Sequence, residues 1–589
     1  MKMTLLSLGV AMALCGACGA TAAPVQASGA THPVKPIGTV NLGALATAAK
    51  AARSAPAAAP ATGAKEYRAM PYHTFPAGRG LRPMTAAGAL SAPRESPVTF
   101  LDAASTAGFR ALDHYDQRIL ADNGNQFSLE PPDQALAVGA GKILEVVNNA
   151  LMVYDPSGNP LLAAPVSTNK FFLQFSEINR STGERGPFLS DPRAYYDAPT
   201  GRFFVVEWAT LNDTQGNPLN ISVQFLAVSQ TSDPTGSWFI YNFETTHQTL
   251  TGCPCLPDFQ QLGLDANGVY ITQNLFGITN GNFVGASMYA LPKLGLENGG
   301  TYFVELPVQT NDFTIHPTVV PPGGQFASEA GGTEYFVETT DDLTQNGLSN
   351  VVNIWALSGT SSLNTSTPSL TLNATAVTTQ TVSANLVPAV QKDGPRPLGN
   401  SFGDAKPKLN PDDGRVSSTP LYLNGQIWAV ASTAVTRSNG ATGDGVAWWQ
   451  FAASGGAPAL AATVTSQGII SPGGRSLLYP AIALNTAGQG GIGVTVVSPG
   501  MYPSTGLIPM PEFARPTIHV AGVGALPDDG FTAYPQEGGN GVGRWGDYGA
   551  AAIDEYGDAW FANEYIPPVT PAYPRSALAN WGTFVTTTP

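Results

Sequence analysis

The sequence predicts an all-β fold, a β-propeller of about seven blades, preceded by a signal peptide and a disordered Ala/Pro-rich leader. The 589 residues include 65 Gly and 49 Pro, far more than helices tolerate and typical of many short strands joined by turns. A strand-and-turn unit recurs with a period of about 60 to 69 residues, which fits a four-stranded blade with long loops. The composition, 43% apolar and 12% charged, is that of a folded chain.

The first residues predict export. A short basic start, Met1-Lys2-Met3-Thr4, precedes an apolar run at residues 5–18 and the small-residue cleavage site Ala20-Thr21-Ala22. We assign residues 1–22 to a signal peptide. Residues 23–97 are rich in Ala, Pro, Gly and Ser and predict a flexible leader or pro-segment that packs little. No other stretch is apolar enough to span a bilayer, so a secreted or periplasmic protein is expected.

The repeat unit places the blades between residues 98 and 589. Alternating apolar residues suit an innermost strand, and the Asp or Asn with Gly that follows suits the turn into the next strand. The clear copies end at the turn residues Asp197, Asp265, Asn424, Asn485 and Asp554. Weaker copies at Pro132 and Pro317 bring the count to seven. The spacing implies an insertion at about residues 340–410.

The end of the chain predicts how the ring closes. Fewer residues than one unit follow Gly549, so the last blade lacks a strand. An N-terminal segment, residues 98–101 or 127–129, is expected to complete it and to leave no open edge. A short helical turn is expected around residues 107–120.

Charge and cysteine content exclude several classes of protein. The formal net charge of -14 and the pI near 4.8 argue against nucleic acid and anionic membranes as partners, since such binding depends on neutralising phosphates. We expect a monomer. After removal of the signal peptide only Cys253 and Cys255 remain, which predicts a local disulfide or two buried thiols rather than a metal or redox site.

Two motifs carry a resemblance to known propellers. The stretch from Thr231 to Trp238 resembles the Asp-box of sialidase-type propellers, in which the aspartate, here Asp233, stabilises a turn. Gly543-Arg-Trp-Gly-Asp-Tyr548, with residues 560–565, resembles a largely uncharacterised group of exported bacterial propellers. This resemblance covers about residues 125–587 and implies the fold but no particular activity.

Candidate ligand-binding residues open the repeat units, because propellers usually bind ligands where their innermost strands begin. We call this end of the channel the mouth. The residues that open the units include Asp133, Asp191, Asp258, His316, Tyr479 and Asp547. Carboxylates from Asp133, Asp191 and Asp258 would suit calcium, which binds six to eight oxygens. The alternative is that each aspartate caps the turn of its own blade.

Arginines and aromatic residues near the same openings extend this list. Arg193, Arg415, Arg475 and Arg544 would bind a substrate carboxylate bidentately, or form salt bridges with neighbouring aspartates. Trp545 would stack on a sugar ring or pack between blades.

Glycoside hydrolysis would need two carboxylates about 5 to 9 Å apart. The catalytic candidates are Glu564, Tyr565 as a sialidase-like nucleophile, and Asp547, with Glu338 and Glu207 as further carboxylates.

Three functions remain open. The first is an exported binding or adhesion propeller that recognises a polysaccharide or cell-surface glycan at the mouth. The second is a secreted carbohydrate-active hydrolase or lyase of sialidase-like architecture. The third is a structural surface protein that binds other proteins.

Overall fold

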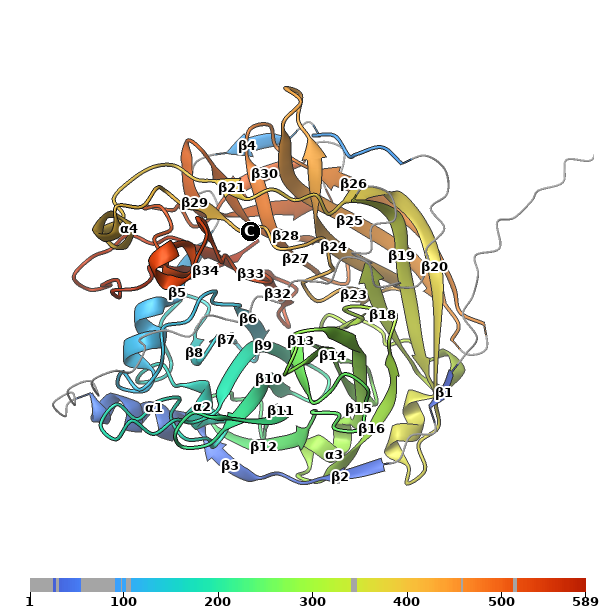
Figure 1. Cartoon of the computed structure of the whole chain (residues 1–589). Helices are drawn as coiled ribbons and strands as arrows, with labels where there is room; N and C mark the ends of the chain where they lie inside the picture. Colours follow the sequence, from blue (N-terminus) through green and yellow to red (C-terminus); the bar gives the residue numbers. More distant parts are fainter. Residues whose placement is uncertain are drawn as a thin grey trace, which may run out of the picture.

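The computed structural model describes residues 25–27, 31–53, 90–96, 98–101, 107–339, 347–456, 459–511 and 516–588. Within these residues, seven sheets follow one another around a central axis. Figure 1 shows them arranged as a ring. The first strand of each sheet lies beside that of the next, and β32 of the last sheet contacts β6 of the first. The ring is therefore closed, and the prediction of an all-β propeller is confirmed. The predicted signal peptide lies outside the described residues.

The first four sheets come from residues 135–383 and three short N-terminal strands. The first sheet contains β6 (Ala135–Gly139), β7 (Lys142–Val147) and β8 (Ala150–Tyr154). The second contains β9 (Phe188–Asp197), β10 (Arg202–Asn212), β11 (Pro218–Ser229), β12 (Ser237–Glu244) and β3 (Gly38–Asn41). The third contains β13 (Cys255–Leu264), β14 (Gly268–Gly277), β15 (Phe283–Pro292), β16 (Thr301–Gln309) and β2 (Thr31–Val34). The fourth contains β17 (His316–Pro317), β18 (Thr333–Thr339), β19 (Leu348–Ser358), β20 (Leu370–Ser383) and β1 (Val25–Ala27).

The last three sheets complete the ring. The fifth contains β23 (Leu421–Leu423), β24 (Gln426–Thr436), β25 (Thr442–Ser454) and β26 (Ala461–Ile470). The sixth contains β27 (Ser476–Leu484), β28 (Gly490–Ser498), β29 (Met501–Met510), β30 (Thr517–Val520) and β4 (Thr99–Leu101). The seventh contains β32 (Ala550–Ile553), β33 (Ala559–Tyr565), β34 (Gly582–Thr587) and β5 (Gly108–Asp113).

Helices are short and few in the described residues. They are α1 (Leu42–Ala52), α2 (Thr168–Phe171), α3 (Lys293–Glu297), α4 (Pro397–Phe402), the π-helix η1 (Asp116–Leu120) and the 3₁₀-helices η2 (Glu329–Gly331), η3 (Thr360–Asn364), η4 (Phe531–Ala533) and η5 (Pro535–Glu537). None of the helices in this part of the chain is long and apolar enough to cross a membrane.

The core lies between neighbouring sheets, as the alternation of apolar residues requires. Between the second and third sheets, for example, Phe204 and Val206 of β10 belong to one buried cluster with Leu262 and Ile271. Each sheet thus buries both faces, because it has a neighbour on each side. This is why the second and third strands read as nearly continuous apolar runs.

The recurring turns join the first and second strands of their sheets, as predicted. The carboxylate of Asp265, between β13 and β14, accepts hydrogen bonds from the main chain of Asn267 and Gly268, both at 2.7 Å. Asn485 and Asp554 cap their own turns in the same way. In the Asp-box-like stretch, Asp233 accepts from the Thr235 N–H at 3.0 Å. These side chains stabilise turns.

The N-terminal region differs from its prediction as a leader that packs little. Strands β1, β2 and β3 each pair antiparallel with the outer strand of a propeller sheet, and α1 follows β3 directly. Figure 1 shows this segment running along the outside of the ring. The prediction is wrong for residues 31–53, because an Ala-rich composition does not distinguish a linker from an added edge strand. Residues 54–89 of the predicted leader lie outside the described residues.

The ring closes through a different segment from either candidate. Strand β5 pairs antiparallel with β34 and completes the last sheet. Residues 98–101, which include β4, instead add a parallel strand to the sixth sheet. The helical turn expected at residues 107–120 is the strand β5 followed by the π-helix η1. An N-terminal closing strand was therefore predicted, but its position was wrong.

The insertion also lies later than expected. Much of residues 348–383 forms β19 and β20, two regular strands of the fourth sheet. The extra chain follows β20, and it contributes α4, β21 (Ala389–Val390) and β22 (Lys408–Leu409). Strand β22 pairs with β31 (Val542–Gly543), which precedes the last sheet. The insertion after β20 and the loop before the last sheet therefore meet at this pair of strands.

Candidate functional site

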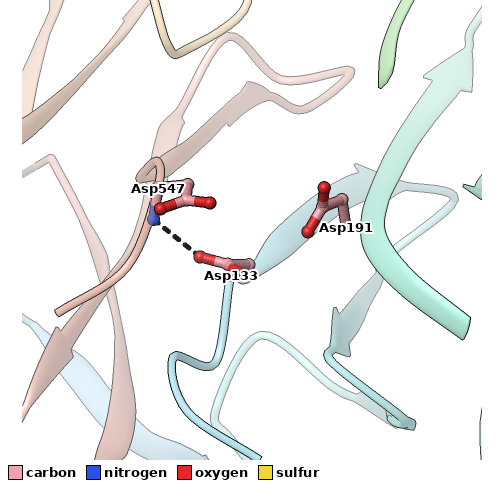
Figure 2. Close-up of side chains that lie close together, drawn as sticks. All are labelled: Asp133, Asp191 and Asp547. Atoms are coloured by element: carbon pink, nitrogen blue, oxygen red, sulfur yellow. Dashed lines mark hydrogen bonds between the residues drawn. The ribbon is translucent and has the colours of Figure 1, made fainter. Parts of the chain in front are cut away.

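Three aspartates meet at the mouth. Asp133 precedes β6, Asp191 lies in β9, and Asp547 lies in the loop before β32, so the first, second and last sheets each supply one. One carboxylate oxygen of each lies within 4.8 Å of those of the other two. Figure 2 shows the three side chains close together. Asp133 and Asp191 are fully buried. Ring closure thus brings together residues that are more than 400 positions apart.

Hydrogen bonds from its own sheet and from the last sheet fix Asp133. Its Oδ1 accepts the main-chain N–H of Asp547 at 2.6 Å, and its Oδ2 accepts the side-chain amide of Asn148 at 2.7 Å. The side-chain oxygen Oδ1 of Asn148 in turn accepts the main-chain N–H of Asp191 at 2.9 Å. Asn148 therefore bridges two of the three aspartates from the turn between β7 and β8.

Asp191 is held by three donors. Its Oδ1 accepts the Ser190 hydroxyl at 2.9 Å, and its Oδ2 accepts the Trp208 indole N–H at 2.9 Å and the Phe259 main-chain N–H at 3.1 Å. Phe259 belongs to β13 of the next sheet. Asp133 and Asp191 therefore connect different sheets instead of capping turns of their own.

The electrostatics of the mouth reflect burial and repulsion between like charges. Burial raises the pKa of Asp133 well above its usual range, and the neighbouring Asp547 and Asp191 raise it further. Burial and Asp547 also raise the pKa of Asp191. Asp258 has a raised pKa for the same reasons, burial first and then Asp191 and Asp547. The structure therefore brings Asp133 and Asp191 together with Asp547, whereas Asp258, the third residue predicted to bind metal, is not in this group of three.

Three arginines surround these carboxylates, and each already has partners. Arg544 contacts Asp547 at 2.7 Å. Arg415 contacts Asp412 at 2.7 Å and Asp413 at 2.8 Å.

Arg193 is more buried than a surface arginine and lines the cavity below the mouth. It donates to the main-chain oxygens of Gln260 and Ser417 and lies 3.3 Å above the ring of Tyr548. The salt-bridge alternative thus describes Arg415 and Arg544. The fourth candidate, Arg475, lies over the ring of Phe100 at 3.8 Å, beside β4, and is not part of the mouth group.

The catalytic candidates Glu564 and Tyr565 do not form a pair. They are adjacent in β33, so their side chains lie on opposite faces of the sheet. Tyr565 packs edge-on against Phe584 of β34. Glu564 is 4% exposed, and burial, Asp528, Glu130 and Asp133 raise its pKa well above the usual range.

The other candidates have structural contacts. His316 is buried and its Nδ1 lies 3.2 Å from the Val416 oxygen, while burial and Arg193 lower its pKa. The Tyr479 hydroxyl donates to the Asn410 oxygen at 2.8 Å. Trp545 is 1% exposed, so it packs inside the ring and presents no face to a sugar.

Glu338 and Glu207 are not in the group of three aspartates, and burial, followed by Asp191, raises the pKa of Glu207. Glu338 accepts from Asn353 and Trp355 within the fourth sheet, and Glu207 is buried in β10.

Sequence reasoning missed four contributors to the mouth. Asn148, Glu130, Asp412 and Asp528 all lie in loops that precede or join strands. Asn148 stands in an Asn-Asn pair between two apolar runs, which signals a turn but not a bridge between aspartates. Asp412 belongs to the insertion, whose path across the mouth no repeat pattern predicts.

Below the mouth, the channel is narrow. A cavity of about 20 Å³ is lined by Gln134, Arg193, Ser418 and Gly549 among others. Because one water needs about 10–15 Å³ when volume is measured this way, the cavity has room for one or two waters and not for a sugar ring. A larger ligand therefore does not fit inside this part of the channel.

The closed ring of sheets and its central channel define the chain as a β-propeller protein. No protein-family model matches the sequence, and no curated protein matches it either.

Solved structures give weak similarities. An α-L-arabinanase from Penicillium chrysogenum, complexed with arabinobiose, is 10% identical over 82% of this chain and 98% of its own, with a TM-score of 0.33. A Trypanosoma rangeli sialidase with sialic acid is 8% identical over 77% and 59%, with a TM-score of 0.34. An exo-β-1,3-galactanase from Clostridium thermocellum is 10% identical over 67% and 77%, with a TM-score of 0.27. These values are too low to indicate a shared substrate.

Proposed function

We propose that this chain is an exported propeller that binds a polysaccharide across the mouth of its channel. The observation that carries the proposal is the charge of the mouth. Carboxylates outnumber guanidinium groups there. The carboxylates are those of Asp133, Asp191, Asp258, Asp412, Asp413 and Asp547, and the guanidinium groups are those of Arg193, Arg415 and Arg544. The partly exposed carboxylates, those of Asp258, Asp412, Asp413 and Asp547, would accept hydrogen bonds from sugar hydroxyl or amino groups, and the excess negative charge would repel acidic polymers.

The partners of the arginines support a neutral or amino-bearing ligand. A site for a substrate carboxylate needs guanidinium groups that are free to bind it. Arg544 and Arg415 already contact aspartates, and Arg193 is 5% exposed and stacks on the ring of Tyr548. An acidic sugar would have to break these ion pairs.

Export is supported by the signal-peptide pattern of residues 1–22 and by a disulfide between Cys253 and Cys255 at the start of β13. Disulfides persist in oxidising compartments, which include the periplasm and the cell exterior. We propose a secreted or periplasmic monomer.

An array of neutral, amino-bearing and acidic polysaccharides tests the proposal. We expect binding to neutral or amino-bearing polymers and none to acidic ones. Asp258→Ala, at the mouth, should weaken binding. Glu555→Gln, in the exposed turn between β32 and β33 at the other end of the channel, should not. Binding that prefers acidic polymers, or that Asp258→Ala leaves unchanged, would contradict the proposal.

The hydrolase is a second candidate because of one observation. Glu564, whose pKa is raised by burial and neighbouring carboxylates, lies near Asp133, and a glycosidase uses two carboxyl groups at close range, one of them a protonated acid. Release of reducing ends from bound polysaccharide, abolished by Glu564→Gln, would favour this function. Binding without release would exclude it.

A further inference from the structure

We propose that Asp133, Asp191 and Asp547 bind a divalent cation, calcium by the chemistry of the ligands, which fastens the ring where its ends meet. The three residues belong to the first, second and last sheets, and one oxygen of each lies within 4.8 Å of the others. A cation between them would link the start of the propeller to its end. This inference does not depend on polysaccharide binding.

The hydrogen bonds around the site fit ionised carboxylates. Both oxygens of Asp133 and both oxygens of Asp191 accept hydrogen bonds. The donors are main-chain N–H groups, an amide, an indole and a hydroxyl. Asn148 and Trp208 each belong to the same sheet as the aspartate that accepts from them. A protonated carboxyl would lose one of these acceptor sites. Donors that orient ligand carboxylates in this way are typical of the residues around metal sites.

Positive charge from the protein does not match these carboxylates. Arg544 contacts Asp547, and Arg193 lies against Tyr548 and two main-chain oxygens. Two fully buried carboxylates thus remain beside a third. A buried carboxyl group is protonated, paired or bound to a cation, and the accepted hydrogen bonds at both oxygens of Asp133 and Asp191 favour the cation.

A fourth carboxylate independently points into the same space. Glu564 is 4% exposed, and its Oε2 accepts no hydrogen bond from any described residue. It faces Asp133 across Gly546, since a Cβ at Gly546 would lie 3.8 Å from Glu564 Oε2 and 3.8 Å from Asp133 Oδ1. A buried carboxylate oxygen without a donor is costly unless a cation or water satisfies it. Glu564 therefore supplies a further oxygen toward the site, directly or through a water.

The all-oxygen ligand set selects the metal. Carboxylate oxygens suit hard cations such as calcium, whereas zinc prefers nitrogen and sulfur ligands. Calcium takes six to eight oxygens, so waters or hydroxyl groups would complete its shell. Asp547 is partly exposed, with 14% of its side chain accessible, which gives the cation a path from solvent.

Calcium titration of the chelator-treated mature chain tests the site. We expect one calcium ion per chain and a rise in melting temperature on its addition. Terbium, a calcium substitute, should luminesce when tryptophan is excited, because the Trp208 indole donates to Asp191. Absence of calcium binding would overturn the proposal. Bound terbium that does not luminesce when tryptophan is excited would also overturn it.

Two aspartate variants locate the site. Asp547→Asn should weaken calcium binding by roughly tenfold or more and reduce the calcium-dependent rise in melting temperature. Asp554→Asn is the matched control, because Asp554 also accepts a tryptophan indole, that of Trp560 at 3.0 Å, but caps its own turn. It should lower stability without changing calcium affinity. Equal affinities in wild type and Asp547→Asn would refute the assignment.

Discussion

Glu145 of β7 accepts a hydrogen bond from the main chain of Leu112 in β5 at 2.9 Å, across the junction between the first and last sheets. Glu145 is fully buried, and burial raises its pKa to about 7, against the opposing effect of hydrogen bonds from Thr583 and Leu112. Ring closure thus depends partly on a carboxyl group that the folded protein prefers to keep neutral.

This gives a pH dependence of stability with a defined sign. The folded-state pKa is above the unfolded value of 4.5, so the stabilisation is complete below pH 4.5 and is lost as the pH rises through about 7. The difference corresponds to about 3 kcal/mol. We expect the melting temperature, measured with chelator present, to fall between pH 5 and pH 8, and Glu145→Gln to reduce this fall.

The control is Glu184→Gln, which changes an exposed glutamate. It should leave the pH dependence as in wild type. Other buried carboxyls, such as Asp528 with a pKa raised by burial to about 7, act in the same direction, so Glu145→Gln reduces the slope without removing it. Identical slopes in Glu145→Gln and wild type would contradict the assignment.

Tyr565→Phe should leave polysaccharide binding and any hydrolysis within about twofold of wild type. Tyr565 packs against Phe584 on the face of β33 opposite to Glu564, so it cannot act as a nucleophile beside that glutamate. Binding isotherms and reducing-end release measure this. A loss of hydrolysis of a hundredfold or more, with the melting temperature unchanged, would restore the sialidase-like mechanism.

Sequence reasoning succeeded for features that depend on a few consecutive residues. Local patterns predicted the turns at Asp265 and Asp554 and the first strands of the sheets, because a turn and an alternating strand depend on a few consecutive residues. The same local reasoning placed Asp133, Asp191 and Asp547 among the residues that open the units, but it assigned calcium to Asp133, Asp191 and Asp258 and chemistry to Asp547.

The rest depended on contacts between distant segments. Whether Glu564 meets Tyr565 or Asp133 is decided by the packing of sheets, and the bridge that Asn148 forms between two aspartates requires residues from two sheets. The outer strands β2 and β3 pair through main-chain atoms, so their composition gave no signal. Arg475 lay near a strand opening in sequence, but β4 placed an aromatic ring beneath it.

Leu42→Ala should destabilise the protein by about 2–4 kcal/mol. Leu42 begins α1 in the N-terminal segment, is fully buried and belongs to the same apolar cluster as Trp238 of β12. Ile37, in the same segment, is 45% exposed, so Ile37→Ala should change stability by less than about 0.5 kcal/mol. Urea unfolding of both variants measures the difference. Equal and small effects would mean that the N-terminal segment adds no stability to the ring.

Calcium binding at the mouth should strengthen as the pH rises. Burial and the neighbouring carboxylates raise the pKa of Asp133 and Asp191, so protons compete with the cation until both groups ionise. Asp258 acts in the same direction, whereas Arg544 lowers the pKa of Asp133. Isothermal titration at pH 5, 6 and 7.5 should show affinity rising at least about tenfold, with proton release at the lower pH values. An affinity that does not change with pH would mean that calcium binds outside this cluster, because exposed carboxylates are already ionised at pH 5.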